Sequence, residues 1–329
     1  MRVFLTGATG YIGSAVLDAA LRAGHQVTAV VRHPEKAERV AARGVKPVVG
    51  ELGHPDVMLP EIAACDAVIH TASEKSPRRV EKDRAAIDAA LNTLSKGGQR
   101  RATFIYTSGV WVLGSTTKPV DETAPVAPTE YVAWRPAHEQ LVLDAGANGL
   151  RTVVVRPGIV YGGSRGIVSD LLKDALNGLV RVIGSGKNRW PTVYDRDLAE
   201  LYMRLLQAPD AEGVFHASDE GDERVNDIVD AIAEHLTQRP DVRHMPMPEA
   251  RRKLGTYADA LALDQRVRSP KAKALGWMPT LSSITTNIPR LFEEYRRGMF
   301  VVMLERVGIQ PSALALGLRT RWRSISASA

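Results

Sequence analysis

The sequence contains a single cysteine, Cys65, so an intramolecular disulfide is excluded. This scarcity fits a reducing compartment, and a cytoplasmic protein is expected. No apolar run approaches the roughly 20 residues that a membrane-spanning helix needs, so an integral membrane protein is not expected. Histidine, cysteine and carboxylate side chains do not cluster with metal-ligand spacing either, and no metal site is predicted.

Outside its C-terminal end, the sequence also lacks a strong net charge. The whole chain carries a formal charge of +6. Residues 296–329 hold six arginines and one glutamate, which leaves 37 basic against 36 acidic residues in 1–295. A nearly neutral body does not indicate a nucleic-acid-binding face, so no nucleic-acid partner is expected.

A glycine-rich turn stands between a predicted strand and a predicted helix at the start of the chain. Residues 2–6 (RVFLT) form a β-branched and aromatic run, 14–23 has helical apolar spacing, and 26–31 is a second strand pattern. Between strand and helix, glycine lets backbone approach a pyrophosphate, which the helix N-terminus attracts. A turn without a ligand is the alternative. The predicted dinucleotide contacts are Gly7, Thr9, Gly10, Tyr11, Ile12 and Gly13.

The end of the second strand indicates which dinucleotide is preferred. An acidic side chain there meets a ribose 2′-hydroxyl, whereas an arginine meets a 2′-phosphate. The strand runs into Arg32 and His33, and the first acid is Glu35. NADP is therefore predicted, with NAD as the alternative and a merely solvated Arg32 as the competing interpretation.

The order of the predicted elements is that of a doubly wound α/β fold. Strand patterns recur at 2–6, 26–31, 46–49, 67–71, 103–107 and 152–156, with helical stretches between most of them. This alternation predicts a Rossmann-type parallel sheet with helices on both faces. We expect a dinucleotide-binding domain at 1–163, to which about 192–217 returns, a smaller C-terminal substrate-binding lobe over most of 164–295, and a basic tail at 296–329.

Seven segments follow one another in an order that is typical of one family. They are TGATGYIG (6–13), VVGEL (48–52), AVIHTAS (67–73), FIYTSG (104–109), VVVRPGIVYG (153–162), VYDRDLAELY (193–202) and KALGWMP (273–279). The chain resembles an extended (atypical) short-chain dehydrogenase/reductase of the NAD(P)-dependent epimerase/dehydratase type, from residue 1 to about 295. A departure is Tyr194, where histidine is usual.

The resemblance implies an NAD(P)-dependent oxidoreductase or epimerase/dehydratase-like enzyme. Such an enzyme acts by hydride transfer on a small molecule, either a carbonyl or hydroxyl compound or a nucleotide sugar. The matching segments imply further cofactor contacts from Glu51, Leu52, Thr71, Ala72, Ser73, Thr107, Pro157, Gly158 and Val160.

The family's catalytic group is altered in this chain. In the family a tyrosine is the general acid/base, a lysine four residues later favours its ionised form, and a Ser or Thr hydroxyl polarises the substrate carbonyl. The tyrosine falls on Tyr131, and the lysine position falls on Arg135. The hydroxyl position falls on Gly109, so Ser108, one residue earlier at the strand end, is the expected hydroxyl, with Thr107 as the alternative.

Pro136 predicts that the next helix begins near residues 134–136, with Tyr131 in the loop before it. Two hypotheses are open. In the first, Tyr131, Arg135 and Ser108 are catalytic residues of an enzyme. In the second, the chain is an NADP-binding sensor or regulatory protein without catalysis, and Tyr131 only lines a pocket. Trp111, Trp134 and Trp190 are further candidates for the pocket lining, with burial in the core as the alternative.

The basic tail departs from the family. Its first part, GMFVVMLERVGI, is apolar enough for a helix, and Pro311 interrupts the residues beyond it. The tail is expected to be an extension, or a helix docked on the body or on the second subunit of a homodimer. A membrane-surface or partner-binding helix is the alternative.

Overall fold

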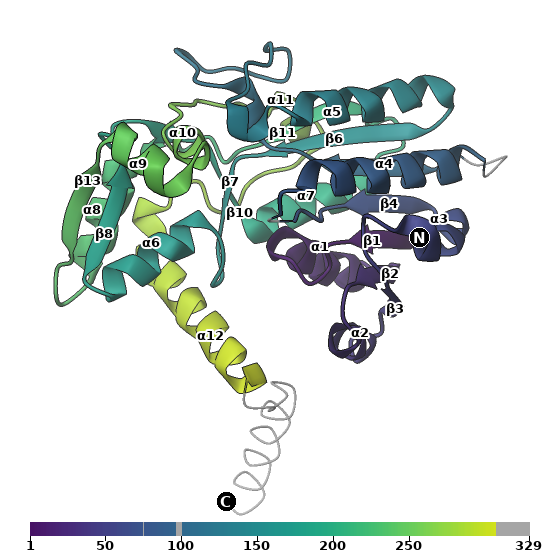
Figure 1. The fold of residues 1–329 in the computed structure, drawn as a ribbon, viewed down its shortest axis with the longest axis horizontal. Coiled ribbons are helices and arrows are strands. Elements are labelled where there is room, and N and C mark those ends of the chain that lie inside the picture. The colour runs from purple at the N-terminus through teal and green to yellow at the C-terminus, as the bar shows by residue number, and fades with distance from the viewer. Residues whose placement is uncertain (75, 97–100, 307–329) are drawn as a thin grey trace, which may run out of the picture.

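A seven-stranded parallel sheet forms the centre of the molecule (Figure 1). The computed structural model describes residues 1–74, 76–96 and 101–306. The strand order is β3–β2–β1–β4–β5–β6–β11. The bounds are β1 (Arg2–Thr6), β2 (Gln26–Val31), β3 (Lys46–Val49), β4 (Ala67–His70), β5 (Thr103–Thr107), β6 (Arg151–Pro157) and β11 (Gly213–Ala217). The order reverses between β1 and β4, where doubly wound folds leave a crevice for a ligand. The predicted Rossmann-type fold is confirmed.

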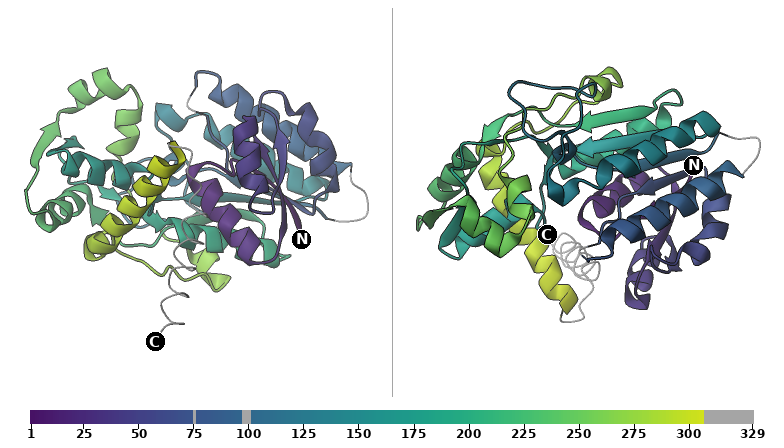
Figure 2. Two further views of the ribbon diagram at one scale, coloured as in Figure 1. Left: turned by 90° about the horizontal axis from the view of Figure 1, so that it is seen from below. Right: turned by 45° about the horizontal axis from the view of Figure 1, so that its top comes forward.

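Helices cover both faces of this sheet (Figure 2). They are α1 (Tyr11–Arg22), α2 (Pro34–Ala41), α3 (Leu59–Ala64), α4 (Arg79–Ser95), α5 (Arg135–Asp144) and α7 (Asp195–Gln207). Because successive strand residues point to opposite faces, Val3 and Leu5 of β1 pack in one core with α1 and α7. Phe4 packs in the other core, with α4 and α5. The short strands are apolar along nearly their whole length because both faces are buried.

A smaller lobe lies beside the sheet (Figure 1). Its elements are α6 (Ile167–Leu176), β8 (Leu179–Ile183), α8 (Val225–His235), β13 (Asp241–Met245), α9 (Met247–Leu254), α10 (Tyr257–Leu261) and α12 (Ile288–Arg306). Strand β13 pairs in parallel with β8, and side chains from α6, α8 and α12 share their core. Short pairs join the lobe to the sheet: β7 (Ile159–Tyr161) with β10 (Thr192–Tyr194), and β9 (Arg189–Trp190) with β12 (Glu223–Arg224).

Helix α12 includes residues 298–306 of the predicted tail helix but begins earlier, at Ile288, and residues 307–329 lie outside the described residues. Among the helices of the described part, none is long and apolar enough to cross a membrane.

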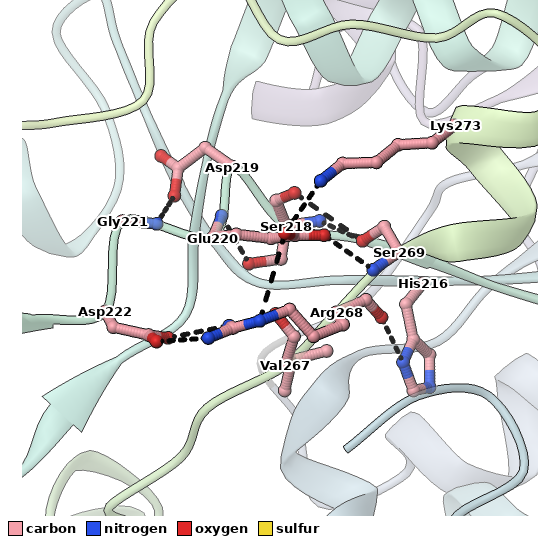
Figure 3. Close-up of polar contacts among 10 residues, drawn as sticks. All are labelled: His216, Ser218, Asp219, Glu220, Gly221, Asp222, Val267, Arg268, Ser269 and Lys273. Carbon is pink, nitrogen blue, oxygen red and sulfur yellow. Dashed lines mark hydrogen bonds and ion pairs between the residues drawn. The ribbon is translucent and has the colours of Figure 1, made fainter. Parts of the chain in front are cut away.

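The loop after β11 is fastened to the segment before and within α11 (Pro270–Ala274) by charged contacts (Figure 3). Arg268 donates to both carboxylate oxygens of Asp222, at 3.0 and 2.6 Å. The carboxylate of Glu220 accepts from the Ser269 backbone at 3.0 Å and pairs with Lys273 at 2.7 Å. Glu220 and Asp222 both have positive φ, 63° and 50°. Such backbone persists only where surrounding contacts hold it, and the network ties the segment at α11 to the loop that follows the edge strand β11.

Asp219 in the same loop makes a pH-dependent contribution to stability. Burial raises the pKa of its carboxyl to about 7, although Gly221 and Thr192 donate hydrogen bonds to it. Because an unfolded aspartate titrates near pH ~3.9, the folded protein binds this proton more tightly. The resulting stabilisation is complete below about pH 4 and is lost as the pH rises through about 7.

Asp219→Asn is therefore expected to gain stability relative to wild type between pH 4.5 and 8. The relative gain is about 1.4 kcal/mol for each unit by which the wild-type pKa is raised. Urea unfolding of both proteins across this pH range measures the gain. All other titratable groups are present in both proteins, so their contributions cancel in the difference. A difference in unfolding free energy that does not change with pH would show that Asp219 is not protonated in the folded state.

Candidate active site

The glycine turn after β1 is packed so tightly that two of its glycines have no room for a side chain. Gly7 has φ +76°, and a Cβ there would lie 2.8 Å from the backbone nitrogen of Ala72. A Cβ on Gly13 would lie 2.0 Å from the carbonyl oxygen of Gly7. Gly10 precedes α1, and no side chain of the described residues caps that helix. Its first N–H groups are thus available to an anion, which fits the pyrophosphate of a dinucleotide.

A cavity of about 360 Å³ opens beside this turn. It lies at the carboxyl ends of β1, β5 and β6, where a doubly wound fold binds its ligand. Nine of the predicted site residues line it: Tyr11, Ile12, Ser73, Ser108, Tyr131, Arg135, Pro157, Gly158 and Val160. Residues that are far apart in the sequence therefore meet in one place, as the motif order predicts.

Tyr131 lies in a 3₁₀ turn, Glu130–Val132, just before α5. The centroid of its ring is 5.0 Å from that of Tyr257 and 6.1 Å from that of Trp111. The guanidinium of Arg79 lies 4.4 Å from the ring centroid and also donates to the Tyr131 carbonyl at 2.8 Å. These contacts hold the ring in the cavity without the helix that usually carries it, and they place a cation against it.

Arg135 is the first residue of α5, where the predicted helix start is confirmed. Its guanidinium donates to the Tyr106 hydroxyl at 3.2 Å and to the Thr107 carbonyl at 3.1 Å. It also stacks on the Trp134 ring at 4.5 Å. The arginine thus lines the cavity while its hydrogen bonds to described residues go to the end of β5.

A buried carboxylate stands behind Arg135. Asp83 accepts a hydrogen bond from the Tyr106 hydroxyl at 2.8 Å and lies 2.7 Å from His138 Nδ1 and 3.2 Å from His70 Nε2. Burial alone would raise the pKa of the Asp83 carboxyl, but hydrogen bonds from His138 and His70 hold it well below its usual range. The network fixes Tyr106 and, through it, Arg135. Within the described residues, no group of three or more His, Cys, Asp and Glu side chains has an arrangement that could hold a metal ion, and this also applies to Asp83 and its two histidines.

The two candidate hydroxyls point in different directions. Thr107 Oγ1 lies 2.6 Å from the Tyr202 hydroxyl of α7. Ser108 is buried, lines the cavity, and its Oγ has no hydrogen-bond partner among the described residues. A buried hydroxyl without a partner is costly and calls for an explanation. A polar atom of a ligand in the cavity would give this hydroxyl a partner.

Gly109, at the family's hydroxyl position, is extended backbone with φ 177°. A Cβ built there would meet only the Pro157 carbonyl oxygen, at 3.8 Å, which is ordinary contact. A side chain thus fits at this position, although the chain has none.

Glu139, four residues after Arg135, has a structural role. Glu139 of α5 accepts from Arg156 Nε at 3.0 and 3.1 Å, and both side chains are buried. This ion pair joins α5 to the end of β6, immediately before Pro157 and Gly158. Gly158 needs its missing side chain, because a Cβ would lie 2.4 Å from the Pro191 carbonyl oxygen.

Arg32 directly follows β2, on the side of β1 away from β5 and β6, and does not line the cavity. Its side chain is 54% exposed and its guanidinium is 3.5 Å from Glu74. Lys82 lies 2.9 Å from Glu74 and 3.5 Å from Glu51, and its hydrogen bond lowers the pKa of Glu74. Two cations, Arg32 and Lys82, thus lie beside Glu74, and Arg32 keeps half of its surface open to solvent.

Comparison with known proteins agrees with this geometry. The model of the NAD dependent epimerase/dehydratase family matches residues 3–217. The chain belongs to this family. An uncharacterized protein of Schizosaccharomyces pombe is 32% identical over 296 residues, which cover 88% of this chain and 98% of that protein.

Two further family relatives bear on chemistry and fold. The 4-hydroxy-2-methyl-3-oxo-4-farnesyl-3,4-dihydroquinoline-1-oxide ketoreductase of Stigmatella aurantiaca is 28% identical, over 76% of this chain and 78% of that protein. A human epimerase family protein, solved with NADPH, superposes with a TM-score of 0.70 at 22% identity, covering 89% of this chain and 99% of that one. The resemblance predicted from the seven segments is confirmed.

The remaining residues predicted from the family motifs lie around the cavity rather than in its wall. Gly7, Thr9, Gly10 and Gly13 form the turn, and the Thr9 carbonyl accepts from Arg165 at 2.9 Å. Thr71 donates to the Thr6 carbonyl at 2.7 Å, the Ala72 N–H lies 3.3 Å from Thr6 Oγ1, and Leu52 is buried. Thr71 and Ala72 thus hold the turn against the end of β4.

Arg79, Glu74 and Ile167 line the cavity although no family motif pointed to them. Their places in the sequence carry no spacing that relates them to Tyr131. Arg79 stands at the start of α4, and only the fold brings it over a ring 52 residues away. Of the three tryptophans considered, Trp111 and Trp134 line this cavity.

Proposed function

We propose that the protein is an NADP-preferring oxidoreductase that interconverts a ketone and the corresponding secondary alcohol. One observation carries the proposal: the uncapped glycine turn, the unpartnered Ser108 hydroxyl and Tyr131 meet at one cavity. The ketoreductase name of the Stigmatella relative supports the ketone, and the NADPH bound to the human relative supports the cofactor.

Each residue has a role that follows from its position. Bound NADPH supplies a hydride, so that the ketone becomes an alcohol and NADP remains. Ser108 donates a hydrogen bond to the substrate oxygen, and Tyr131 transfers its hydroxyl proton to that oxygen and regains one from solvent. The guanidinium of Arg79 lies over the Tyr131 ring and keeps the ring in the cavity. Arg135, through its hydrogen bonds to Tyr106 and Thr107, holds the part of the cavity wall that lies between Ser108 and Tyr131.

Ser108→Ala is expected to lower kcat about a hundredfold, since one donor to the developing oxyanion is lost. The double variant Ser108→Ala/Gly109→Ser moves the hydroxyl to the family's usual position, where a Cβ meets nothing closer than 3.8 Å. We expect it to recover part of the lost rate. Steady-state NADPH oxidation measures both variants, and an unchanged kcat in Ser108→Ala would exclude this role.

Arg32→Ser is expected to raise the Kd for NADPH roughly 10- to 100-fold, because a charge-assisted hydrogen bond to the 2′-phosphate is lost. The Kd for NADH, which has no such phosphate, should stay within about twofold. Arg22→Ser is the control, because it removes one exposed positive charge from the far end of α1. Nicotinamide fluorescence titration gives all Kd values. Equal losses for NADPH and NADH would contradict the assignment of Arg32.

An NADP-binding sensor without catalysis is the rival function. The observation that favours it is Arg135, whose hydrogen bonds to described residues go to Tyr106 and Thr107 of β5 rather than to Tyr131. The discriminating experiment is to bind NADPH and then add aldehydes, ketones and UDP-sugars while following nicotinamide fluorescence. Turnover supports the oxidoreductase, whereas tight NADPH binding without turnover on any compound supports the sensor.

A further inference from the structure

A second cavity, of about 430 Å³, lies in the smaller lobe next to the first. Its walls come from α6, β8, β9, α8, β13, α9 and α10. Ile167 lines both cavities. Tyr257 lines the second, and its ring centroid is 5.0 Å from that of Tyr131 and 5.9 Å from that of Trp111, which line the first. The two cavities therefore adjoin at the tyrosine.

The interior of the second cavity is apolar. Its buried lining consists of Leu171, Val182, Trp190, Val225, Met245 and Leu261. The indole N–H of Trp190 already donates to the Leu261 carbonyl at 3.0 Å, so it is occupied within the wall. Burying apolar substrate surface here is favourable, whereas burying a sugar or a uracil without hydrogen-bond partners is costly.

The charged residues of this cavity sit away from that interior. Asp170, Arg181 and Lys253 are exposed, and Asp174 is half-buried. Two acids and two bases give this edge no net charge. A diphosphate, which needs a clear excess of positive charge or helix N-termini, is therefore not favoured.

From this geometry we infer that the substrate is a hydrophobic ketone or secondary alcohol. Its oxygen lies between Ser108 and Tyr131, and its aliphatic or ring body extends past Tyr257 into the second cavity. The inference rests on the proposed function for the position of the oxygen, but the apolar site itself does not depend on catalysis. The apolar lining of the second cavity disfavours the nucleotide sugars that the family resemblance also allows.

The test is calorimetric titration of the protein saturated with NADP⁺, in which a ketone binds without turning over. We expect the Kd of straight 2-alkanones to fall about fourfold for each added methylene from 2-pentanone until the cavity is filled. The heat capacity change should be negative. UDP-glucose should bind more weakly than 2-undecanone. A Kd that does not change with chain length, or tighter binding of UDP-glucose, would overturn the inference.

Leu254→Trp narrows the cavity from its edge, where the leucine is 41% exposed and a larger side chain does not strain a core. The variant is expected to raise the Kd of 2-undecanone at least tenfold and the Kd of 2-pentanone by less than twofold. Leu176→Trp is the matched control, because Leu176 is 45% exposed on α6 and does not line the cavity. Equal affinities in the two variants would contradict the site.

The binding experiment separates the inference from the proposed function. If the Kd of the ketones depends on chain length but no ketone is reduced by NADPH, the apolar site is supported and the oxidoreductase is contradicted. If ketones are reduced by NADPH but their Kd does not depend on chain length, the oxidoreductase is supported and the apolar site is contradicted.

Discussion

Tyr131→Phe is expected to lower kcat for ketone reduction by about 10²- to 10⁴-fold and to leave the Kd for NADPH within about twofold. The substitution removes only the hydroxyl. The ring contacts with Trp111 and Tyr257 and the cation of Arg79 remain, so the fold and the cavity are kept. Rapid-mixing measurement of NADPH oxidation reports the chemical step, and a thermal melt checks that stability is unchanged.

Tyr257→Phe is the matched control for that variant. It removes a phenolic hydroxyl from the same aromatic cluster, 5.0 Å away between ring centroids, but from a side chain that lines only the second cavity. At saturating ketone we expect its kcat to stay within about threefold of wild type, because kcat then does not report the substrate affinity that the second cavity sets, whereas loss of a general acid lowers kcat itself. Equal rates in Tyr131→Phe and wild type would remove Tyr131 from the mechanism while leaving the cofactor site in place.

Gly13→Ala has the second large expected effect, an increase of at least about a hundredfold in the Kd for NADPH. The added Cβ would lie 2.0 Å from the Gly7 carbonyl oxygen and 2.6 Å from Thr71 Oγ1. Backbone cannot yield there without opening the turn, so the first N–H groups of α1 leave their positions. Overpacking of this kind also costs about 1–3 kcal/mol of unfolding free energy.

Gly109→Ala is the control for Gly13→Ala, because it adds the same methyl group near the cavity where its nearest neighbour is 3.8 Å away. Fluorescence titration of NADPH and urea unfolding should be close to wild type for this control. NADPH binding by Gly13→Ala with wild-type affinity would mean that the turn does not hold the dinucleotide.

The fold was predictable because its signals are local. Six strands, the glycine turn and the late start of α5 at Arg135 follow from apolar periodicity and from the properties of Gly and Pro. Strand β11 was not among the predicted strands, since its run, GVFHA, is short and its partner β6 is about sixty residues earlier in the chain.

The arrangement within the site was only partly predictable, because it depends on contacts between distant segments. Ser108 and Thr107 were alternatives in the sequence, and our proposal takes Ser108 because Tyr202 occupies the Thr107 hydroxyl. Tyr131 was expected outside the helix, but the cation over its ring comes from Arg79 and the neighbouring ring from Tyr257. The apolar second cavity is assembled from seven elements, so no single motif can indicate it.

The central claim is that this site transfers a hydride between NADPH and a ketone. Its most direct test is a single turnover with 2-undecanone and NADPH in which both nicotinamide C4 hydrogens are deuterium, with the product examined by mass spectrometry and NMR. One deuterium is expected on the carbinol carbon of 2-undecanol, and Tyr131→Phe should form none of this product within the same time. Unchanged ketone beside tightly bound, unoxidised NADPH would show that the site does not transfer a hydride to this ketone.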